Sequence, residues 1–171
     1  MEAKPFPRLL WEKLPWLVVF AVGFGYDQWT KRWIIANFQE RQIQPVTDWF
    51  NLTRLHNEGA AFSFLANAGG WQKHFFITLA LVVSAVVAIW LWRLPTRNHK
   101  LLSGGLALIL SGALGNAIDR LLYGHVVDFL DVYYQTYHWP AFNVADSCIF
   151  VGAFLVILDV FVNGDRDADS Q

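Results

Sequence analysis

Four long apolar segments constrain the fold of this chain more than any other feature of its sequence. They cover approximately residues 14–35, 75–92, 101–122 and 142–162. Each approaches the length of about 20 residues that an α-helix needs to cross the hydrocarbon core of a bilayer. A helix also pairs its own backbone amides and carbonyls, which a segment inside a bilayer requires. The sequence therefore predicts an all-α membrane protein with four transmembrane helices, forming a single integral membrane domain over residues 1–171.

The composition agrees with a membrane location and excludes several kinds of ligand. Hydrophobic residues make up 55% of the chain and charged residues 16%, whereas an average soluble domain is about 25% charged. The net charge is −1, and the sequence has neither a basic cluster nor a glycine-rich phosphate loop. We therefore expect no nucleic acid or nucleotide as a ligand. The single cysteine, Cys148, lies in an apolar run and is expected to serve packing.

Tryptophans and basic residues predict how the segments are placed in the bilayer. Trp11 and Trp16 flank one end of the first segment, and Trp29 and Trp33 mark its other end; this distribution is typical of aromatic belts at the two membrane interfaces. The loop 93–100 carries three Lys or Arg residues and no acid, so the positive-inside rule places it in the cytoplasm. With four spans, both termini are then cytoplasmic.

The two longer connections are consequently expected on the extracytoplasmic side. In the outer β segment, about residues 39–65, the alternation in WFNLTRL (49–55) indicates a strand. The residues NEG (57–59) then indicate a turn, and AAFSFL (60–65) can return as a second strand. We expect a small extracytoplasmic antiparallel β-sheet on the membrane surface, with a helical linker as the alternative. The other outer connection, about residues 123–141, is expected to be a loop.

Polar side chains gather at the outer ends of the expected spans and in the outer connections. Ionisable groups in a membrane are costly and usually functional. Asn116, Asp119 and Arg120 are three or four residues apart and therefore share one side of a helix. The full set on this side comprises Asp27, Lys31, Asn57, Asn116, Asp119, Arg120, Asp128, Asn143 and Asp146.

Structural roles compete with functional ones at several of these positions. Asn143 followed by Asp146 fits a capping box at the start of a helix, which is compatible with a catalytic carboxylate. The neighbours Asp119 and Arg120 fit a structural ion pair. The same interpretation applies to Asp27 and Lys31, which are four residues apart.

The motifs of other hydrolase classes are missing from the sequence. Its histidines have no metal-ligand spacing such as HExxH, and no serine sits in a GxSxG elbow. No metal or cofactor is therefore expected. Carboxylate chemistry remains as the interpretation of the polar cluster.

Five short blocks resemble, in order and spacing, the signature blocks of the lipoprotein signal peptidases, the type II signal peptidases of bacteria. The blocks are DQWTK (27–31), NEGAAFS (57–63), GALGNAIDR (112–120), VVDF (126–129) and FNVADS (142–147). The resemblance extends over nearly the whole chain from the first apolar segment to the last.

The resemblance implies an aspartic endopeptidase of the bacterial inner membrane, signal peptidase II, with its active site on the extracytoplasmic side. Such an enzyme cuts diacylglyceryl-modified prolipoproteins just before the lipidated cysteine. Its catalytic aspartates would be Asp128 and Asp146. The implied partners are these substrates, membrane lipid and inhibitors of the globomycin type, and we expect a monomer. The implied substrate-binding or supporting residues are Asn57, Gly59, Asn116, Asp119, Arg120, Asn143, Asp27 and Lys31.

Two carboxyl groups can hydrolyse an amide without a covalent intermediate. The ionised group takes a proton from water, and the protonated group polarises the carbonyl. Asp146 is expected in the first turn of a helix, where the dipole favours a negative charge, and this predicts Asp146 as the base. A proton-coupled membrane transporter is the alternative from another class, although it requires polar residues through the whole thickness of the bundle. A non-enzymatic assembly factor is a third possibility, in which both acids could be replaced without loss of activity.

Overall fold

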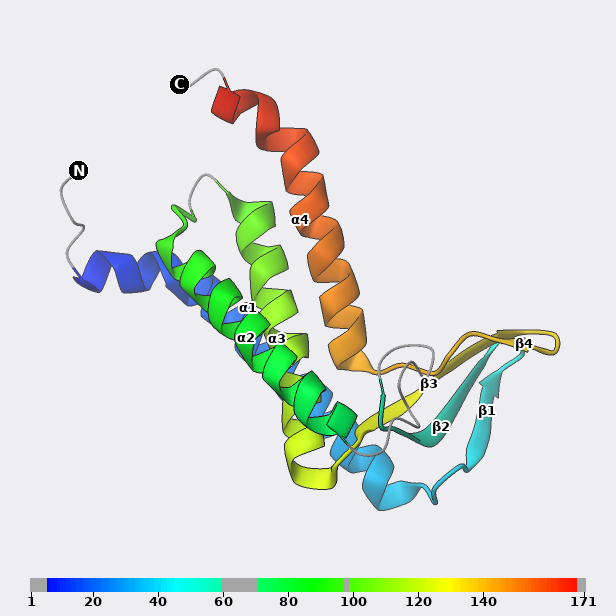
Figure 1. The fold of residues 1–171 in the computed structure, drawn as a ribbon. Coiled ribbons are helices and arrows are strands. Elements are labelled where there is room, and N and C mark those ends of the chain that lie inside the picture. Colours follow the sequence, from blue (N-terminus) through cyan, green and yellow to red (C-terminus); the bar gives the residue numbers. More distant parts are fainter. Residues whose placement is uncertain (1–5, 60–70, 97–98, 169–171) are drawn as a thin grey trace.

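The computed structural model describes residues 6–59, 71–96 and 99–168 (Figure 1). Four helices and four strands lie within these residues. The helices are α1 (Phe6–Asn37), α2 (Trp71–Arg93), α3 (Lys100–Tyr123) and α4 (Val144–Ala168). The strands are β1 (Ile43–Thr47), β2 (Phe50–Asn57), β3 (Val126–Tyr134) and β4 (Tyr137–His138).

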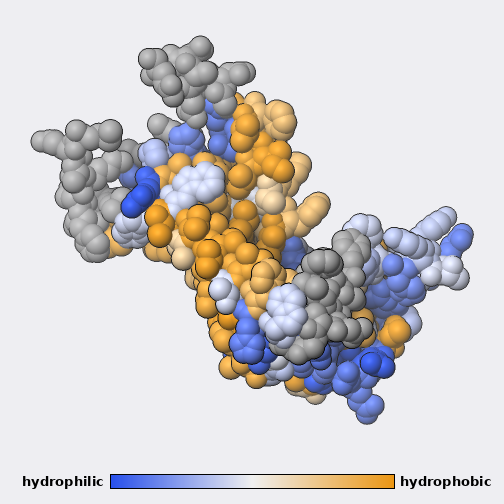
Figure 2. Space-filling view, viewed as in Figure 1, coloured by the Kyte–Doolittle hydropathy of each residue, from blue (hydrophilic) through white to orange (hydrophobic). Residues whose placement is uncertain are grey.

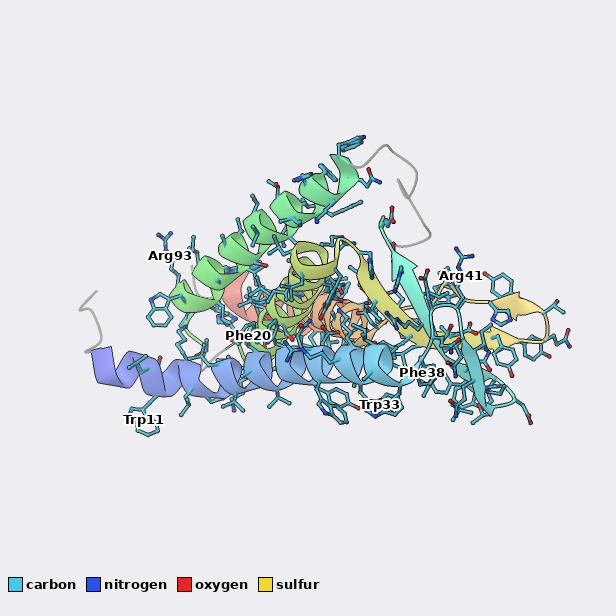
Figure 3. All side chains as sticks on the ribbon, turned by 90° about the horizontal axis from the view of Figure 1, so that it is seen from below. Trp11, Phe20, Trp33, Phe38, Arg41 and Arg93 are labelled. Carbon is cyan, nitrogen blue, oxygen red and sulfur yellow. The ribbon has the colours of Figure 1, made fainter. Side chains whose placement is uncertain are left out.

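All four apolar segments form helices, and three of these helices are long and apolar enough to cross a membrane. The three are Trp71–Arg93, Lys100–Tyr123 and Val144–Asn163. The helix α1 is 32 residues long, but it is not among the candidate spans found within the described residues. The transmembrane placement of α1 therefore stays a prediction. Figure 3 shows Trp11 near one end of α1 and Trp33 near the other, both pointing away from the other helices, as expected for side chains at the two interfaces.

The helix α3 forms the centre of the bundle and packs against α1, α2 and α4. Glycines allow α3 and α4 to approach each other closely, as small residues do in membrane helix pairs. A Cβ on Gly105 would lie 2.6 Å from the carbonyl oxygen of Gly152, and a Cβ on Gly112 would collide with the carbonyl oxygen of Ala145. Because Ala145 precedes Asp146, this contact fixes the start of α4 against α3.

The four strands form one antiparallel sheet in the order β1-β2-β3-β4. The strand expected at residues 49–55 is confirmed as β2, which pairs with β1 on one side and with β3 on the other. The expectation of a loop over residues 123–141 is wrong, because β3 and β4 lie there. The sequence of β3, VVDFLDVYY, is rich in β-branched and aromatic residues, which favour strands. The second strand predicted at residues 60–65 falls outside the described residues.

The sheet and the bundle differ in surface character and meet at one small core. Figure 2 shows hydrophobic residues covering the helical part of the molecule and mainly hydrophilic residues on the sheet. Ile34 and Phe38 at the end of α1 pack against Val127 and Phe129 of β3. This core holds the sheet at the end of the bundle where α1 and α3 finish and α4 begins, which is where the polar residues gather (Figure 1).

Candidate active site

Asp128 lies on β3, opposite Leu55 of β2, and is only 3% exposed. Each of its carboxyl oxygens accepts a hydrogen bond from an amide side chain: Asn57 Nδ2 lies 2.9 Å from Oδ2, and Asn143 Nδ2 lies 2.7 Å from Oδ1. Burial, followed by the nearby charge of Asp146, raises the pKa of Asp128 from 3.8 to about 7. Asp128 is therefore suited to hold a proton near neutral pH.

Asp146 lies in the first turn of α4, and the expected capping box is confirmed. The backbone amide of Asp146 donates to Asn143 Oδ1 at 2.9 Å, and Asp146 Oδ2 accepts from the backbone amide of Asn143 at 3.2 Å. The other carboxyl oxygen, Oδ1, accepts from Asn116 Nδ2 at 2.8 Å. The cap leaves this carboxyl group facing the same cavity as Asp128.

Asn143 connects the two acids through a single side chain. Its Oδ1 caps the helix at Asp146, while its Nδ2 donates to Asp128 and, at 3.3 Å, to Asn116 Oδ1. The residue is fully buried. Because both ends of its amide are engaged, the positions of Asp128 and Asp146 are set relative to each other.

Both acids line a cavity of about 800 Å³. Asn57, Asn116 and Arg120 are its other polar wall residues, together with Ser147. The remaining wall is apolar and comes from the start of β3, the segment before α4 and α4 itself: Val126, Trp139, Pro140, Ala141, Phe142, Ile149, Phe150, Val151 and Ala153. The site thus combines a small polar end with an extended apolar wall, an arrangement that suits a substrate with an apolar chain beside a polar reacting group.

Behind Asn116 lies a buried network centred on Lys31. The expected ion pair of Lys31 with Asp27 is confirmed at 2.9 Å, and Lys31 forms a second pair with Asp119, also at 2.9 Å. Lys31 Nζ donates in addition to Asn116 Oδ1 at 2.8 Å, which directs the amide nitrogen of Asn116 toward Asp146. Asp27 also accepts from the backbone amide of Ala145 at 2.8 Å.

Arg120 does not follow the expected pairing with Asp119, because Lys31 from α1 occupies that carboxylate. Instead, Arg120 Nη2 donates to the carbonyl oxygen of Gly59 at 2.6 Å, and its guanidinium lies 5.1 Å from the ring centroid of Phe76. Its Nε is buried and has no hydrogen-bond partner among the described residues. Arg120 therefore anchors the turn after β2 beside the cavity that it lines.

The residues singled out in the sequence thus come together in one cluster at the cavity. Asn57, Asn116, Arg120, Asp128 and Asp146 line the cavity, Asn143 and Gly59 contact members of that set, and Asp27, Lys31 and Asp119 lie behind it. Within the described ranges, no group of three or more His, Cys, Asp or Glu side chains is placed to hold a metal.

Sequence reasoning missed Gln28 and did not identify the residues of the apolar wall. Gln28 is buried and donates to Asp119 Oδ1 at 3.0 Å. Its position one residue after Asp27 and three before Lys31 was a usable signal, because it places all three at neighbouring positions of one helix. The wall residues, such as Phe142 and Phe150, give no such signal, since their apolar side chains do not differ from those that face lipid.

Comparison with known proteins identifies the family. The family model described as Signal peptidase (SPase) II matches residues 19–162. A lipoprotein signal peptidase from Alteromonas mediterranea is 52% identical over 158 residues, which is 92% of this chain and 86% of the relative. One from Pseudoalteromonas atlantica is 52% identical over 151 residues, 88% of this chain and 90% of the relative.

Solved structures agree with these sequence matches. A bacterial membrane enzyme solved by the in meso method superposes with a TM-score of 0.79 at 27% identity, covering 89% of this chain and 90% of that one. A second structure with the same description gives a TM-score of 0.75 at 27% identity, covering 87% and 94%. With its apolar helices, the chain is a multi-pass membrane protein, and it belongs to the signal peptidase II family of proteases.

Proposed function

We propose that this protein removes the signal peptide from prolipoproteins by aspartic catalysis, with Asp128 and Asp146 as the catalytic acids. The observation that carries the proposal is that both carboxyl groups line one cavity and are bridged by Asn143. The scissile bond is the one just before the cysteine that bears a diacylglyceryl group.

The two acids have different environments, and this difference supports different roles for them. Asp146 begins α4, where the helix dipole favours a negative charge, and accepts two hydrogen bonds. Asp128 is buried with a raised pKa and holds the proton that the pair shares. Asp146 takes a proton from water as the water oxygen attacks the carbonyl, and Asp128 donates a hydrogen bond to the developing oxyanion. The leaving nitrogen then receives the proton from Asp146, and the peptide bond breaks.

Arg120 and the turn after β2 hold the substrate beside the acids. Arg120 lines the cavity, and its guanidinium group is a hydrogen-bond donor for a substrate carbonyl there. Its bond to Gly59 also supports Asn57, because the amide of Gly59 donates to Asn57 Oδ1 at 3.0 Å and Asn57 in turn donates to Asp128. Replacing Arg120 with alanine would therefore reduce both substrate binding and the order of the site.

The apolar wall on α4 accommodates the acyl chains of the substrate. It starts beside the acids and continues along the membrane-facing helix through Ile149, Phe150 and Ala153. A lipid-anchored cysteine would thus bring its peptide bond to the membrane edge, where water can enter while the apolar wall strengthens local electrostatic interactions. An inhibitor of the globomycin type is expected to occupy the same cavity.

The same arrangement supports a proposal for the membrane sidedness of the site. The start of α1, the end of α2 and the end of α4 lie at the end of the bundle away from the sheet (Figure 1). With the basic loop 93–100 in the cytoplasm of a bacterium, both termini are cytoplasmic and the acids face the outside of the inner membrane. A transporter is not favoured, because most of the side chains on α2 are apolar and exposed and the polar residues of the site gather at one end of the bundle.

Cleavage of a defined precursor tests this function. The purified protein, in lipid vesicles, is incubated with one precursor that carries the diacylglyceryl group and a matched one that does not, and the products are identified by mass spectrometry. We expect cleavage before the modified cysteine and much slower cleavage of the unmodified precursor. Equal rates would contradict the role of the apolar wall, and cleavage of neither precursor would contradict the proposed activity.

A further inference from the structure

Gln28 is a buried amide side chain on α1 for which the mechanism above has no role. It is 7% exposed and lies on the helix that carries Asp27 and Lys31. Its Nε2 lies 3.0 Å from Asp119 Oδ1, 3.2 Å from Asp27 Oδ2 and 3.3 Å from the carbonyl oxygen of Gly115. These acceptors come from two helices, so Gln28 joins α1 to the last two turns of α3.

The shortest of these contacts, with Asp119, connects Gln28 to the active site. Asp119 divides its carboxylate between two directions: Oδ1 accepts from Gln28, while Oδ2 accepts from Lys31 and, at 3.3 Å, from the backbone amide of Val127. Val127 is fully buried and immediately precedes Asp128 on β3. The Asp119 carboxylate therefore holds the start of β3, the strand that carries the proposed catalytic acid Asp128.

The chain between Asp119 and β3 is short and turns sharply. The helix α3 ends at Tyr123, and Gly124 follows in a left-handed conformation with φ of 86°, a common way to end a helix. After this turn, β3 begins at Val126. A rotation of the Asp119 carboxylate would thus be transmitted to Val127 and to the side chain one residue further on.

We propose that Gln28 is a positioning residue for Asp128, acting through the Asp119 carboxylate and the backbone amide of Val127. Lys31, three residues along α1, acts on the other acid through Asn116. One face of α1 therefore supports both acids, by two branches that share the Asp119 carboxylate. This inference rests on the function proposed above.

The test compares Gln28→Met, which keeps the length of the side chain but removes its donor, with Thr30→Val. Among the residues that the structure describes, the Thr30 hydroxyl bonds only to carbonyls of its own helix, at 2.8 Å to Tyr26 and 2.9 Å to Asp27, so its replacement is a matched control. Gln28→Met removes all three contacts of Nε2, and we expect kcat to fall by at least about fivefold, the equivalent of one buried hydrogen bond, with KM unchanged. Thr30→Val should retain the wild-type kcat. An unchanged kcat in Gln28→Met would overturn the proposal.

A double-mutant cycle separates positioning from a general loss of stability. If Gln28 acts through Asp119, Gln28→Met should cause no further loss in an Asp119→Asn background but the full loss in an Asn116→Ala background. Losses that multiply with Asp119→Asn would overturn the inference. Wild-type cleavage, measured in the same assay, tests the proposed function separately from the role of Gln28.

Hydrogen exchange gives a readout that needs no activity. In Gln28→Met, the amide of Val127 should exchange faster because its acceptor is less fixed, while the amides where β2 pairs with β1 should be unaffected. Unchanged exchange at Val127 would contradict the proposal even if the double variants fail to fold.

Discussion

Lys31 shows at the scale of single residues how this protein tolerates charge in its interior. It is only 1% exposed, yet it contacts Asp27, Asp119 and the amide oxygen of Asn116. A buried charge is tolerated when partners of this kind surround it, and removing one member leaves the others without compensation. The same lysine thus stabilises the fold and orients Asn116 toward Asp146.

Replacing Lys31 with methionine should destabilise the protein severely. The variant leaves two buried carboxylates without their cation, and we expect a loss of about 3–5 kcal/mol in the free energy of unfolding. Lys100→Met, at an exposed position, is the control and should change the value by less than about 0.5 kcal/mol. Chemical denaturation in detergent measures both variants. A loss in Lys31→Met no larger than that of the control would show that the network is not structural.

Asp128 should make stability depend on pH in a direction set by its raised pKa. Because the folded-state pKa lies near 7 and the ordinary value is 3.8, the folded state favours the protonated form. This contribution to stability is fully present below the ordinary value and is lost as the pH rises through 7.

Asp128→Asn, which resembles the protonated acid, should therefore be more stable than the wild type at about pH 8, with a smaller difference at about pH 5. Thermal unfolding at the two pH values measures this difference. Asp48→Asn, at an exposed position, is the control. A difference in Tm that does not change with pH would contradict the burial of an acid at this site.

Among the structural elements, the contact between α3 and α4 controls the position of Asp146. The backbones meet at Gly105 with Gly152 and at Gly112 with Ala145, so neither pair leaves room for a side chain. A methyl group at Gly112 would displace the first turn of α4, which carries the proposed catalytic acid Asp146.

Gly112→Ala should consequently affect both stability and activity. Overpacking of this kind typically costs about 1–3 kcal/mol, and we expect the cleavage rate to fall with it because Asp146 moves relative to Asp128. Gly25→Ala on α1 is the matched control, since a Cβ there meets nothing within 4 Å. If both variants cleave the precursor at the same rate, the close approach of α3 and α4 does not position the site.

Structural elements can be predicted from the sequence when the residues that indicate them are neighbours in the chain. The helices of the apolar segments and the capping box at Asn143 depend on neighbouring residues, and the structure confirms both, although the membrane span of α1 stays a prediction. Strand β2 was also predictable from its alternation, but its partner β3 lies about 70 residues further along the chain. No local pattern in residues 123–141 indicates which segment they pair with, so the strand was missed although its composition favours one.

The same distinction explains the site as a whole. The polar residues could be assigned to one side of the bundle because each lies near the end of an apolar segment. The partners of Asp119 could not be predicted, because its neighbour Arg120 is adjacent in sequence whereas Lys31 reaches it only after α1 packs on α3. Gln28 depends on that same packing, which is why sequence reasoning overlooked it.

In the molecule as a whole, the polar sheet lies at one end of the apolar helices. We expect the axis from the sheet to the opposite end of the bundle to cross the membrane. Because Cys148 is the only cysteine, a Cys148→Ser background allows single cysteines to report sidedness. Thr47→Cys on the exposed strand β1 should react with a membrane-impermeant thiol reagent added from outside the inner membrane. Arg93→Cys at the end of α2 should react only after that membrane is permeabilised. The reverse pattern would invert the proposed topology.

The central claim is that Asp128 and Asp146 together activate one water, and the initial rate of cleavage of a diacylglyceryl-modified precursor tests it most directly. The rate is measured for the wild type, Asp128→Asn and Asp146→Asn in the same lipid vesicles, with thermal unfolding as a check on folding. Each substitution should reduce the rate by about a thousandfold, because it removes a general acid or base while keeping the shape of the side chain. A folded variant of either kind that retains more than about a tenth of the wild-type rate would contradict catalysis by the pair.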